Sequence, residues 1–260
     1  SGETADTIAA MRECQRRGAK TLAIVNVVGS TIAKIADWCL YTWAGPEIAV
    51  ATTKGYTTQL TVLYLFALYA AKKLETVEDS TWRKLLSALK ALPKQIQQAL
   101  DMNPGMVHLA KKYHSACSMF FIGRNTDYAV ALEGALKMKE ISYIHAESYA
   151  AGELKHGTIA LICEGQPVIA LCCNDSVSEK TMSNIVEVKA RGTEVLAVAF
   201  RDNARIVSLA DDMLYIPKID PLFSAAVEIV PLQILAYHVA KENSCDIDKP
   251  KNLAKSVTVE

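Results

Sequence analysis

The sequence predicts an α/β fold in which helices cover both faces of parallel sheets. Strand-length segments such as Val195–Phe200 are apolar throughout instead of alternating with polar residues, which is typical of strands buried on both faces. These segments alternate with helix-length segments, the order expected of parallel strands joined by helical crossovers. A third observation is an internal repeat, which indicates that one α/β unit occurs twice.

The chain resembles itself at a fixed offset, so that Glu13 corresponds to Glu187, 174 residues later. The other matches are Arg17-Gly18 with Arg191-Gly192, Leu22-Ala23 with Leu196-Ala197, Ala36-Asp37 with Ala210-Asp211, Leu40-Tyr41 with Leu214-Tyr215, and Gln59 with Gln233. Residues 118–174 precede the second copy and have no counterpart before Ser1. We therefore expect two repeats, of which the first is truncated at its N-terminus.

The first copy contains the following expected elements in order. It begins with an amphipathic helix ended by a glycine (Thr4–Arg17), followed by a continuous apolar strand (Leu22–Val27). A short helix (Ser30–Ala36) and a short strand (Cys39–Trp43) come next. A long helix is predicted at Thr52–Leu74; it is apolar on most faces, so we expect it to be buried.

A connector separates the copies. An amphipathic helix is predicted at Asp79–Leu100, with a break at Pro93, and Asp101–Gly105 has the residues of a turn. The second copy has predicted strands at Met119–Ile122, Pro167–Cys172, Val195–Phe200 and Met213–Ile216, and helices at Asp127–Ser142, Ser178–Arg191 and Ser224–Lys241. We assign residues 1–75 to the first copy, 76–105 to the helical connector, 106–245 to the second copy and 246–260 to a C-terminal tail.

Composition excludes several function classes. Acidic and basic residues balance at 28 each, so no overall field favours nucleic acid or an anionic membrane. The longest apolar stretch, Leu60–Ala71, is too short to span a bilayer. The seven cysteines have no CxxC spacing, which favours reduced, buried thiols in a cytoplasmic protein over disulfides or a metal site.

The segment Glu133–Gly157 concentrates chemistry-bearing residues among alanines and glycines. Lys137 and Glu140 are three residues apart and share one face of a predicted helix, and His156 follows a turn. Taken alone, the Lys137–Glu140 pair is more typical of a surface ion pair, and His156 of a loop histidine. Lys255, in a polar C-terminal segment, is by itself most simply a solvated lysine.

The first residues, Ser1-Gly2-Glu3-Thr4, open a predicted helix. Hydroxyls, a glycine and free amides at a helix N-terminus suit a phosphate group. The alternative is an ordinary N-cap, a position where Ser and Thr are common.

Four segments together carry a resemblance to a known family: Ser1–Thr7, Gly45–Lys54, Glu133–Gly157 and Asn252–Glu260. They resemble the isomerase half of glutamine–fructose-6-phosphate transaminases, also called glucosamine-6-phosphate synthases. The resemblance covers essentially the whole chain. It implies two tandem SIS domains of flavodoxin-like, three-layer α/β/α topology with parallel sheets, the first of them incomplete here.

The resemblance also implies roles for individual residues. Ser1 and Thr4 match phosphate-binding positions. Val50, Thr52 and Ala254 match positions that contact the sugar, although the family more often has Ser in place of Thr52. That change keeps the hydroxyl and adds a methyl group, so we expect substrate binding to survive with altered packing.

Four further residues match catalytic positions. Glu140 matches the base that moves a proton between C1 and C2, and Lys137 a lysine that supports it. His156 matches a ring-opening histidine supplied by the other subunit, and Lys255 the lysine that forms a Schiff base with the open-chain sugar. These residue types suit an aldose–ketose shift, which needs a positioned carboxylate and an acid–base group.

The function implied is conversion of fructose 6-phosphate and glutamine-derived ammonia to glucosamine 6-phosphate, in a homodimer without metal or organic cofactor. The ammonia would come from a glutaminase domain that is not in this chain. One alternative is another SIS isomerase or deglycase, against which the Ala254–Glu260 tail argues. The other is a non-catalytic sugar-phosphate sensor, which would not need Glu140, His156 and Lys255.

Overall fold

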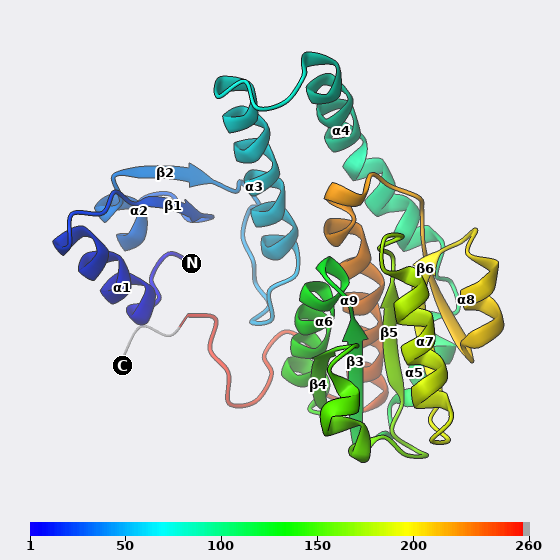
Figure 1. The fold of residues 1–260 in the computed structure, drawn as a ribbon. Coiled ribbons are helices and arrows are strands. Elements are labelled where there is room, and N and C mark those ends of the chain that lie inside the picture. The colour runs from blue at the N-terminus through cyan, green and yellow to red at the C-terminus, as the bar shows by residue number, and fades with distance from the viewer. Residues whose placement is uncertain (257–260) are drawn as a thin grey trace. The chain divides into compact units, whose positions relative to one another are not determined.

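The structure, a computed structural model, describes residues 1–256 and contains two compact units (Figure 1). Unit 1 comprises residues 1–83 together with residues 248–256 of the C-terminal segment, and unit 2 comprises residues 84–247. The long helix α4 (Asp79–Asp101) begins in unit 1 and ends in unit 2. Unit 1 is therefore built from two segments that are far apart in the sequence.

Unit 2 contains a five-stranded parallel sheet. Its strands are β3 (Ser118–Gly123), β4 (His145–Ala150), β5 (Val168–Cys172), β6 (Val195–Phe200) and β7 (Asp212–Ile216). The spatial order is β4-β3-β5-β6-β7, with every neighbouring pair parallel. Numbered from β3, this is the order 2-1-3-4-5 of the flavodoxin-like doubly wound fold.

Helices cover both faces of this sheet. They are α5 (Met106–Tyr113), α6 (Thr126–Ser142), α7 (Ser178–Lys189), α8 (Ala204–Leu209) and α9 (Ala225–Glu242), with short 3-10 turns η1 (Leu154–His156), η2 (Thr158–Leu161) and η3 (Pro221–Phe223). Helix α9 packs on α5 and α6, while α7 packs on α8. Alternate residues of β3 point to opposite faces: Phe120 joins the cluster beneath α7, and Phe121 lies against Gly134 of α6.

Unit 1 contains a two-stranded parallel sheet of β1 (Leu22–Val25) and β2 (Trp38–Tyr41). Its helices are α1 (Ala5–Arg16), α2 (Thr31–Ile35) and α3 (Lys54–Lys73). A small core forms around Ala23, Val25 and Ile32.

The 174-residue offset is also present in the backbone. Strand β1 pairs with β2 in the same register as β6 pairs with β7. Leu22 pairs with Trp38, and the residues 174 positions later, Leu196 and Asp212, also pair. A side-chain contact repeats as well. Asp37 Oδ2 accepts the Thr21 N–H at 2.9 Å, and the equivalent Asp211 Oδ2 accepts the Val195 N–H at 2.8 Å.

The predicted strands and helices all occur, with their ends within two residues of the expected positions. Three regular elements, α5, α8 and β4, were not predicted. Strand β4 has the sequence His145–Ala150, which contains adjacent polar residues and no apolar run. It lies at the edge of the sheet, where β3 is its one partner among the described strands, and most of its residues are only partly buried.

The expectation that Thr52–Leu74 is a buried helix is wrong. Only Gly55 and Leu68 of α3 are buried, and its large apolar residues Leu63, Leu65, Phe66 and Tyr69 are all exposed. The strand on which helix α3 packs is β1. A two-stranded sheet covers only one side of a 20-residue helix.

The break expected at Pro93 is also wrong, because α4 continues through it. Proline removes one helical hydrogen bond, but the apolar face of α4 buries Leu89, Leu92 and Ala99 and holds the helix together.

The cysteines are free thiols, as predicted, but they are not all buried. Cys14, Cys117 and Cys163 are exposed, whereas Cys172 and Cys173 are buried. Cys14 and Cys117 lie at or near the ends of elements, where an apolar sequence context does not guarantee burial.

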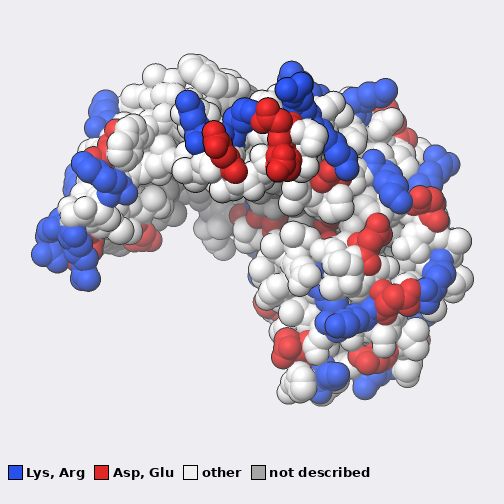
Figure 2. Space-filling view, turned by 45° about the horizontal axis from the view of Figure 1, so that its top comes forward, with Lys and Arg blue, Asp and Glu red and all other residues white. Residues whose placement is uncertain are grey.

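The surface carries both signs of charge. Lys and Arg side chains are interspersed with Asp and Glu on the face shown in Figure 2. Among residues 1–256, no helix combines the length and apolar character needed to cross a bilayer.

The core of unit 2 contains two acidic side chains, Asp127 at the start of α6 and Glu228 in the first turn of α9, both fully buried. Asp127 Oδ2 accepts the N–H groups of Cys173 and Asn174 at 2.9 and 3.2 Å. Within residues 1–256, its Oδ1 and both Glu228 oxygens have no hydrogen-bond partner. Burial, with the nearby Asp127 charge, raises the pKa of Glu228 to about 8, and burial raises the pKa of Asp127 to about 6. Glu228 is therefore protonated at neutral pH.

We expect Glu228→Gln to remove a pH-dependent loss of stability. In the unfolded chain Glu228 ionises near its usual pKa of 4.5, but in the folded chain it stays neutral to about pH 8. The wild type should therefore lose stability as pH rises between these values, on the order of 3 kcal/mol by pH 7 relative to the variant. Urea unfolding of both proteins from pH 4.5 to 8 measures this difference. Glu242→Gln, at a partly exposed site on the same helix, is the control. Parallel pH profiles of stability for the wild type and Glu228→Gln would contradict a neutral, buried Glu228.

Candidate functional site

Unit 1 contains a cavity of about 410 Å³. It is bounded by β1, the N-terminal end of α1 and the segment that leads into α3. The polar residues that line it include Ser1, Thr4, Thr7, Asn26, Thr42, Glu47, Thr52 and Gln59. Three residues predicted to bind substrate, Ser1, Thr4 and Thr52, thus lie around one cavity.

The loop Ser1–Thr4 is fixed by the N-terminal end of α2. The Gly2 carbonyl accepts the Ile32 N–H at 3.0 Å, and Glu3 Oε1 accepts the Thr31 N–H at 2.8 Å. Gly2 has φ +79°, and a Cβ there would lie 2.3 Å from Ser30 Oγ. Only glycine fits this left-handed, close-packed position.

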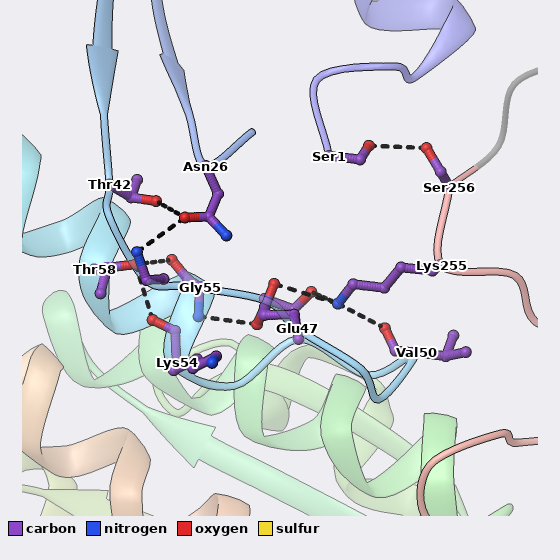
Figure 3. Close-up of polar contacts among 12 residues, drawn as sticks. Ser1, Asn26, Thr42, Glu47, Val50, Lys54, Gly55, Thr58, Lys255 and Ser256 are labelled. Carbon is purple, nitrogen blue, oxygen red and sulfur yellow. Dashed lines mark hydrogen bonds and ion pairs between the residues drawn. The ribbon is translucent and has the colours of Figure 1, made fainter. Parts of the chain in front are cut away.

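The hydroxyl groups of this loop are not used to cap α1. Thr4 occupies the N-cap position of α1, but its side chain makes no capping hydrogen bond. Ser1 Oγ lies 2.8 Å from Ser256 Oγ in the C-terminal segment (Figure 3). The simple N-cap alternative therefore does not describe Thr4, and the start of α1 keeps its amides available for an anion.

Lys255 lies within this unit and is not a freely solvated lysine. Its Nζ donates to Glu47 Oε2 at 3.3 Å, the Val50 carbonyl at 3.4 Å and Thr52 Oγ1 at 3.3 Å. Figure 3 shows the Lys255 side chain extended toward Glu47 and Val50. Glu47 and Thr52 line the cavity, so Lys255 is hydrogen bonded to two residues of its lining.

The loop that carries Glu47 is held by Asn26, which follows β1. Asn26 Oδ1 accepts from Thr42 Oγ1 at 3.0 Å and from the Ala44 N–H at 2.9 Å. Its Nδ2 donates to the Gly45 carbonyl at 2.7 Å. One amide side chain thus fixes the backbone immediately before Glu47.

Unit 2 contains the second group of predicted residues, on α6. Lys137 is buried, and its Nζ lies 2.6 Å from Glu140 Oε2 and 3.3 Å from Glu133 Oε1. Burial raises the pKa of Glu133, while the Lys137 charge opposes that rise. The Glu140 side chain remains 22% exposed. A partly exposed carboxylate held by a buried ammonium is a positioned proton acceptor.

The other two predicted residues show no such contacts. His156 ends η1 and is exposed, and Ala254 is exposed in the C-terminal segment. Within residues 1–256 the structure records no hydrogen bond between His156 and either Lys137 or Glu140. Val50 is half-buried, and its N–H donates to the Asp248 carbonyl at 2.9 Å.

The sequence analysis missed Glu47, Glu133 and Asn26 as members of these groups. Glu133 is four residues before Lys137, a spacing that places both on one helix face, so it could have been found. Glu47 has no comparable signal, because its partner Lys255 is 208 residues away.

Comparison with known proteins agrees with this architecture. A family model for the SIS domain matches residues 1–69 and 112–242. The chain belongs to the SIS domain family.

Within this family the chain is similar to one group of enzymes over its whole length. It is 53% identical to the glutamine–fructose-6-phosphate aminotransferase (isomerizing) of Caldanaerobacter subterraneus subsp. tengcongensis, covering all of this chain and 43% of that protein. The enzyme of the same name from Methanosarcina acetivorans is 51% identical, with 42% of it covered. The chain therefore spans less than half the length of these curated relatives.

A solved structure gives the same result for the fold. The C-terminal domain of glucosamine–fructose-6-phosphate aminotransferase from Francisella tularensis superposes with a TM-score of 0.92 at 36% identity. The match covers 96% of this chain and 71% of that chain. The SIS chain thus corresponds to the C-terminal, isomerase part of these aminotransferases.

We expect Lys137→Met to destabilise this SIS chain by about 3 kcal/mol at pH 7, because it leaves two neighbouring carboxylates, Glu133 and Glu140, without their buried counter-charge. The loss should shrink at pH 5, since the carboxylates of the variant can then bind protons. Denaturant unfolding at both pH values measures it. Lys139→Met, on the exposed face of the same helix, should change stability by less than about 0.5 kcal/mol. Equal losses for the two variants would show that Lys137 is not a buried counter-charge.

Proposed function

We propose that this chain is the isomerase part of a glutamine–fructose-6-phosphate aminotransferase. It would convert fructose 6-phosphate and ammonia to glucosamine 6-phosphate, with the ammonia supplied by glutamine hydrolysis in a glutaminase domain. The observation that carries the proposal is that Lys255 is hydrogen bonded to Glu47 and Thr52, two residues that line the unit 1 cavity. Similarity to these enzymes over all 260 residues supports it.

We propose that the Ser1–Thr4 loop binds the phosphate group. Gly2 and Glu3 anchor the loop to α2, which leaves the Thr4 hydroxyl and the first amides of α1 as donors. The Ser1 hydroxyl would exchange its contact with Ser256 Oγ for one with the phosphate. The proposed contacts with the remainder of the sugar come from Val50, Thr52 and Ala254. The extra methyl group of Thr52 does not prevent its hydroxyl from accepting a hydrogen bond from Lys255.

The proton transfer between C1 and C2 is assigned to Glu140. A carboxylate can remove a proton from one carbon and return it to the next without leaving its position. Lys137 keeps this carboxylate in place through a 2.6 Å contact. This contact fixes the orientation of the Glu140 carboxylate for the proposed proton transfer.

Lys255 is assigned the covalent step. Its amine would attack the carbonyl carbon of the open-chain sugar and form a Schiff base, which makes the neighbouring C–H more acidic. His156 is assigned ring opening, and we propose that it acts in the site of the other subunit of a homodimer. Its exposure at the end of η1 is consistent with such a role.

The domain organisation that we propose is two tandem SIS domains, the first incomplete, at residues 1–75 and 106–245. A helical connector (76–105) joins them, and residues 246–260 form a tail that contributes Lys255. The common register of β1–β2 and β6–β7 supports a duplication.

We expect Glu140→Gln to abolish product formation without weakening substrate binding, because the amide keeps the shape of the side chain but cannot accept the proton. The intact protein would be incubated with fructose 6-phosphate and ammonium, and glucosamine 6-phosphate and glucose 6-phosphate would be quantified. Calorimetry would measure fructose 6-phosphate binding. Turnover by Glu140→Gln at the wild-type rate would exclude Glu140 as the base. Binding without turnover by the wild type would instead favour a sugar-phosphate sensor.

A mixing experiment tests the proposed dimer. His156→Asn and Lys255→Ala homodimers should each be inactive. A mixed dimer would have one intact site, with His156 from one subunit and Lys255 from the other. Subunit exchange at equal amounts should therefore restore about one quarter of the wild-type activity. Mixtures that stay inactive after exchange has been shown by native mass spectrometry would contradict the shared site.

A further inference from the structure

We propose that Glu47 is the residue that positions Lys255 for its covalent step. This inference rests on the proposed function, because it gives a role to a carboxylate that acts only through Lys255. It assigns Glu47 no direct contact with the sugar.

The position of the Glu47 carboxylate is fixed independently of Lys255. Its Oε1 accepts the Gly55 N–H at 3.0 Å, at the first turn of α3, where the helix dipole stabilises a negative charge. The side chain is only 15% exposed. A Cβ at Gly55 would lie 2.8 Å from Glu47 Oε2 and 2.9 Å from its Oε1. The carboxylate therefore needs glycine at this position in order to reach the helix end.

Lys255 is oriented by this fixed charge. Its three described acceptors are Glu47, Val50 and Thr52, and Glu47 is the only carboxylate among them. Hydrogen bonds to a charged partner are stronger than those to a carbonyl or a hydroxyl. Lysine has a long, flexible side chain in a segment without regular structure, so the entropy lost in holding it must be offset by such a contact.

The chemistry needs both the position and a proton acceptor. Before attack, the Lys255 ammonium loses one proton. Glu47 Oε2, 3.3 Å from Lys255 Nζ, is positioned to accept it. The amine lone pair then forms the C–N bond while the carbonyl π pair moves to oxygen. That oxygen leaves as water with the two remaining protons of the amine nitrogen, which gives the imine. No oxidant, reductant or further reactant is required.

Reductive trapping of the imine tests the inference directly. The intact protein that carries these residues would be mixed with fructose 6-phosphate, and sodium borohydride would reduce the C=N bond to a stable secondary amine. Peptide mass spectrometry would then give the rate at which the adduct forms on Lys255. Calorimetry would measure fructose 6-phosphate binding in parallel.

We expect Glu47→Gln to slow adduct formation at least tenfold, about 1.4 kcal/mol in the barrier, while the Kd for fructose 6-phosphate changes less than twofold. Gly55→Ala should have the same effect, because it keeps the carboxylate but displaces it. Glu13→Gln, which removes an exposed ion pair on α1, is the control and should label at the wild-type rate.

Each remaining outcome is decisive. Wild-type labelling rates in both Glu47→Gln and Gly55→Ala would overturn the positioning role. Slower labelling together with an equal loss of substrate binding, or with a lower unfolding temperature than Glu13→Gln, would assign Glu47 a structural role and also overturn it. Absence of an adduct on Lys255 in the wild type would overturn the proposed function, and this inference with it.

Discussion

Parallel strand pairing determines where the polar side chains of this protein gather. Parallel strands need helical crossovers, so the carboxyl ends of the strands and the N-terminal ends of the following helices gather at the same edge of a sheet. In unit 1, Asn26 follows β1 and Thr42 follows β2, and the two side chains are hydrogen bonded. The polar residues around the cavity are close together because the topology brings strand ends together, although they are scattered in the sequence.

The second determinant is how the fold neutralises buried carboxylates. Glu133 and Glu140 share the ammonium of Lys137, Glu47 is held between a helix N-terminus and Lys255, and Glu228 is neutralised by a proton. A buried charge without compensation would cost several kcal/mol. The first two solutions pair the carboxylate with a positively charged side chain. The third removes the charge, so Glu228 can lie in the core of unit 2 but is not available as a base near pH 7.

The fold was largely predictable, since apolar strand runs and helix-length segments depend on local sequence. The errors arose where tertiary context decides. Strand β4 was missed because an edge strand needs little apolar surface, and α3 was expected to be buried because its composition says nothing about how many neighbours pack on it. Pro93 was expected to end a helix that its buried apolar face instead holds together. In each case packing, which the local sequence does not record, decided the outcome.

The candidate site was predictable only where chemistry and local spacing coincide. Lys137 and Glu140 are adjacent on one helix, so their contact follows from sequence. Local sequence gave Lys255 no function, and only the resemblance of the C-terminal segment assigned it one. In the structure, residues 248–256 form part of unit 1, and Lys255 contacts Glu47 and Thr52 there.

Three contacts bind this segment to the first residues of the chain and to the loop before α3. They are the Val50 N–H to the Asp248 carbonyl, Ser1 Oγ to Ser256 Oγ, and Lys255 to Glu47. Each joins residues about 200 or more positions apart, so none is visible as a sequence pattern. A lysine held in this way can approach the cavity only after unit 1 has folded around its own C-terminal segment. The covalent chemistry proposed for Lys255 would therefore be coupled to the completion of the fold, because the segment that carries this amine has no helix or strand of its own.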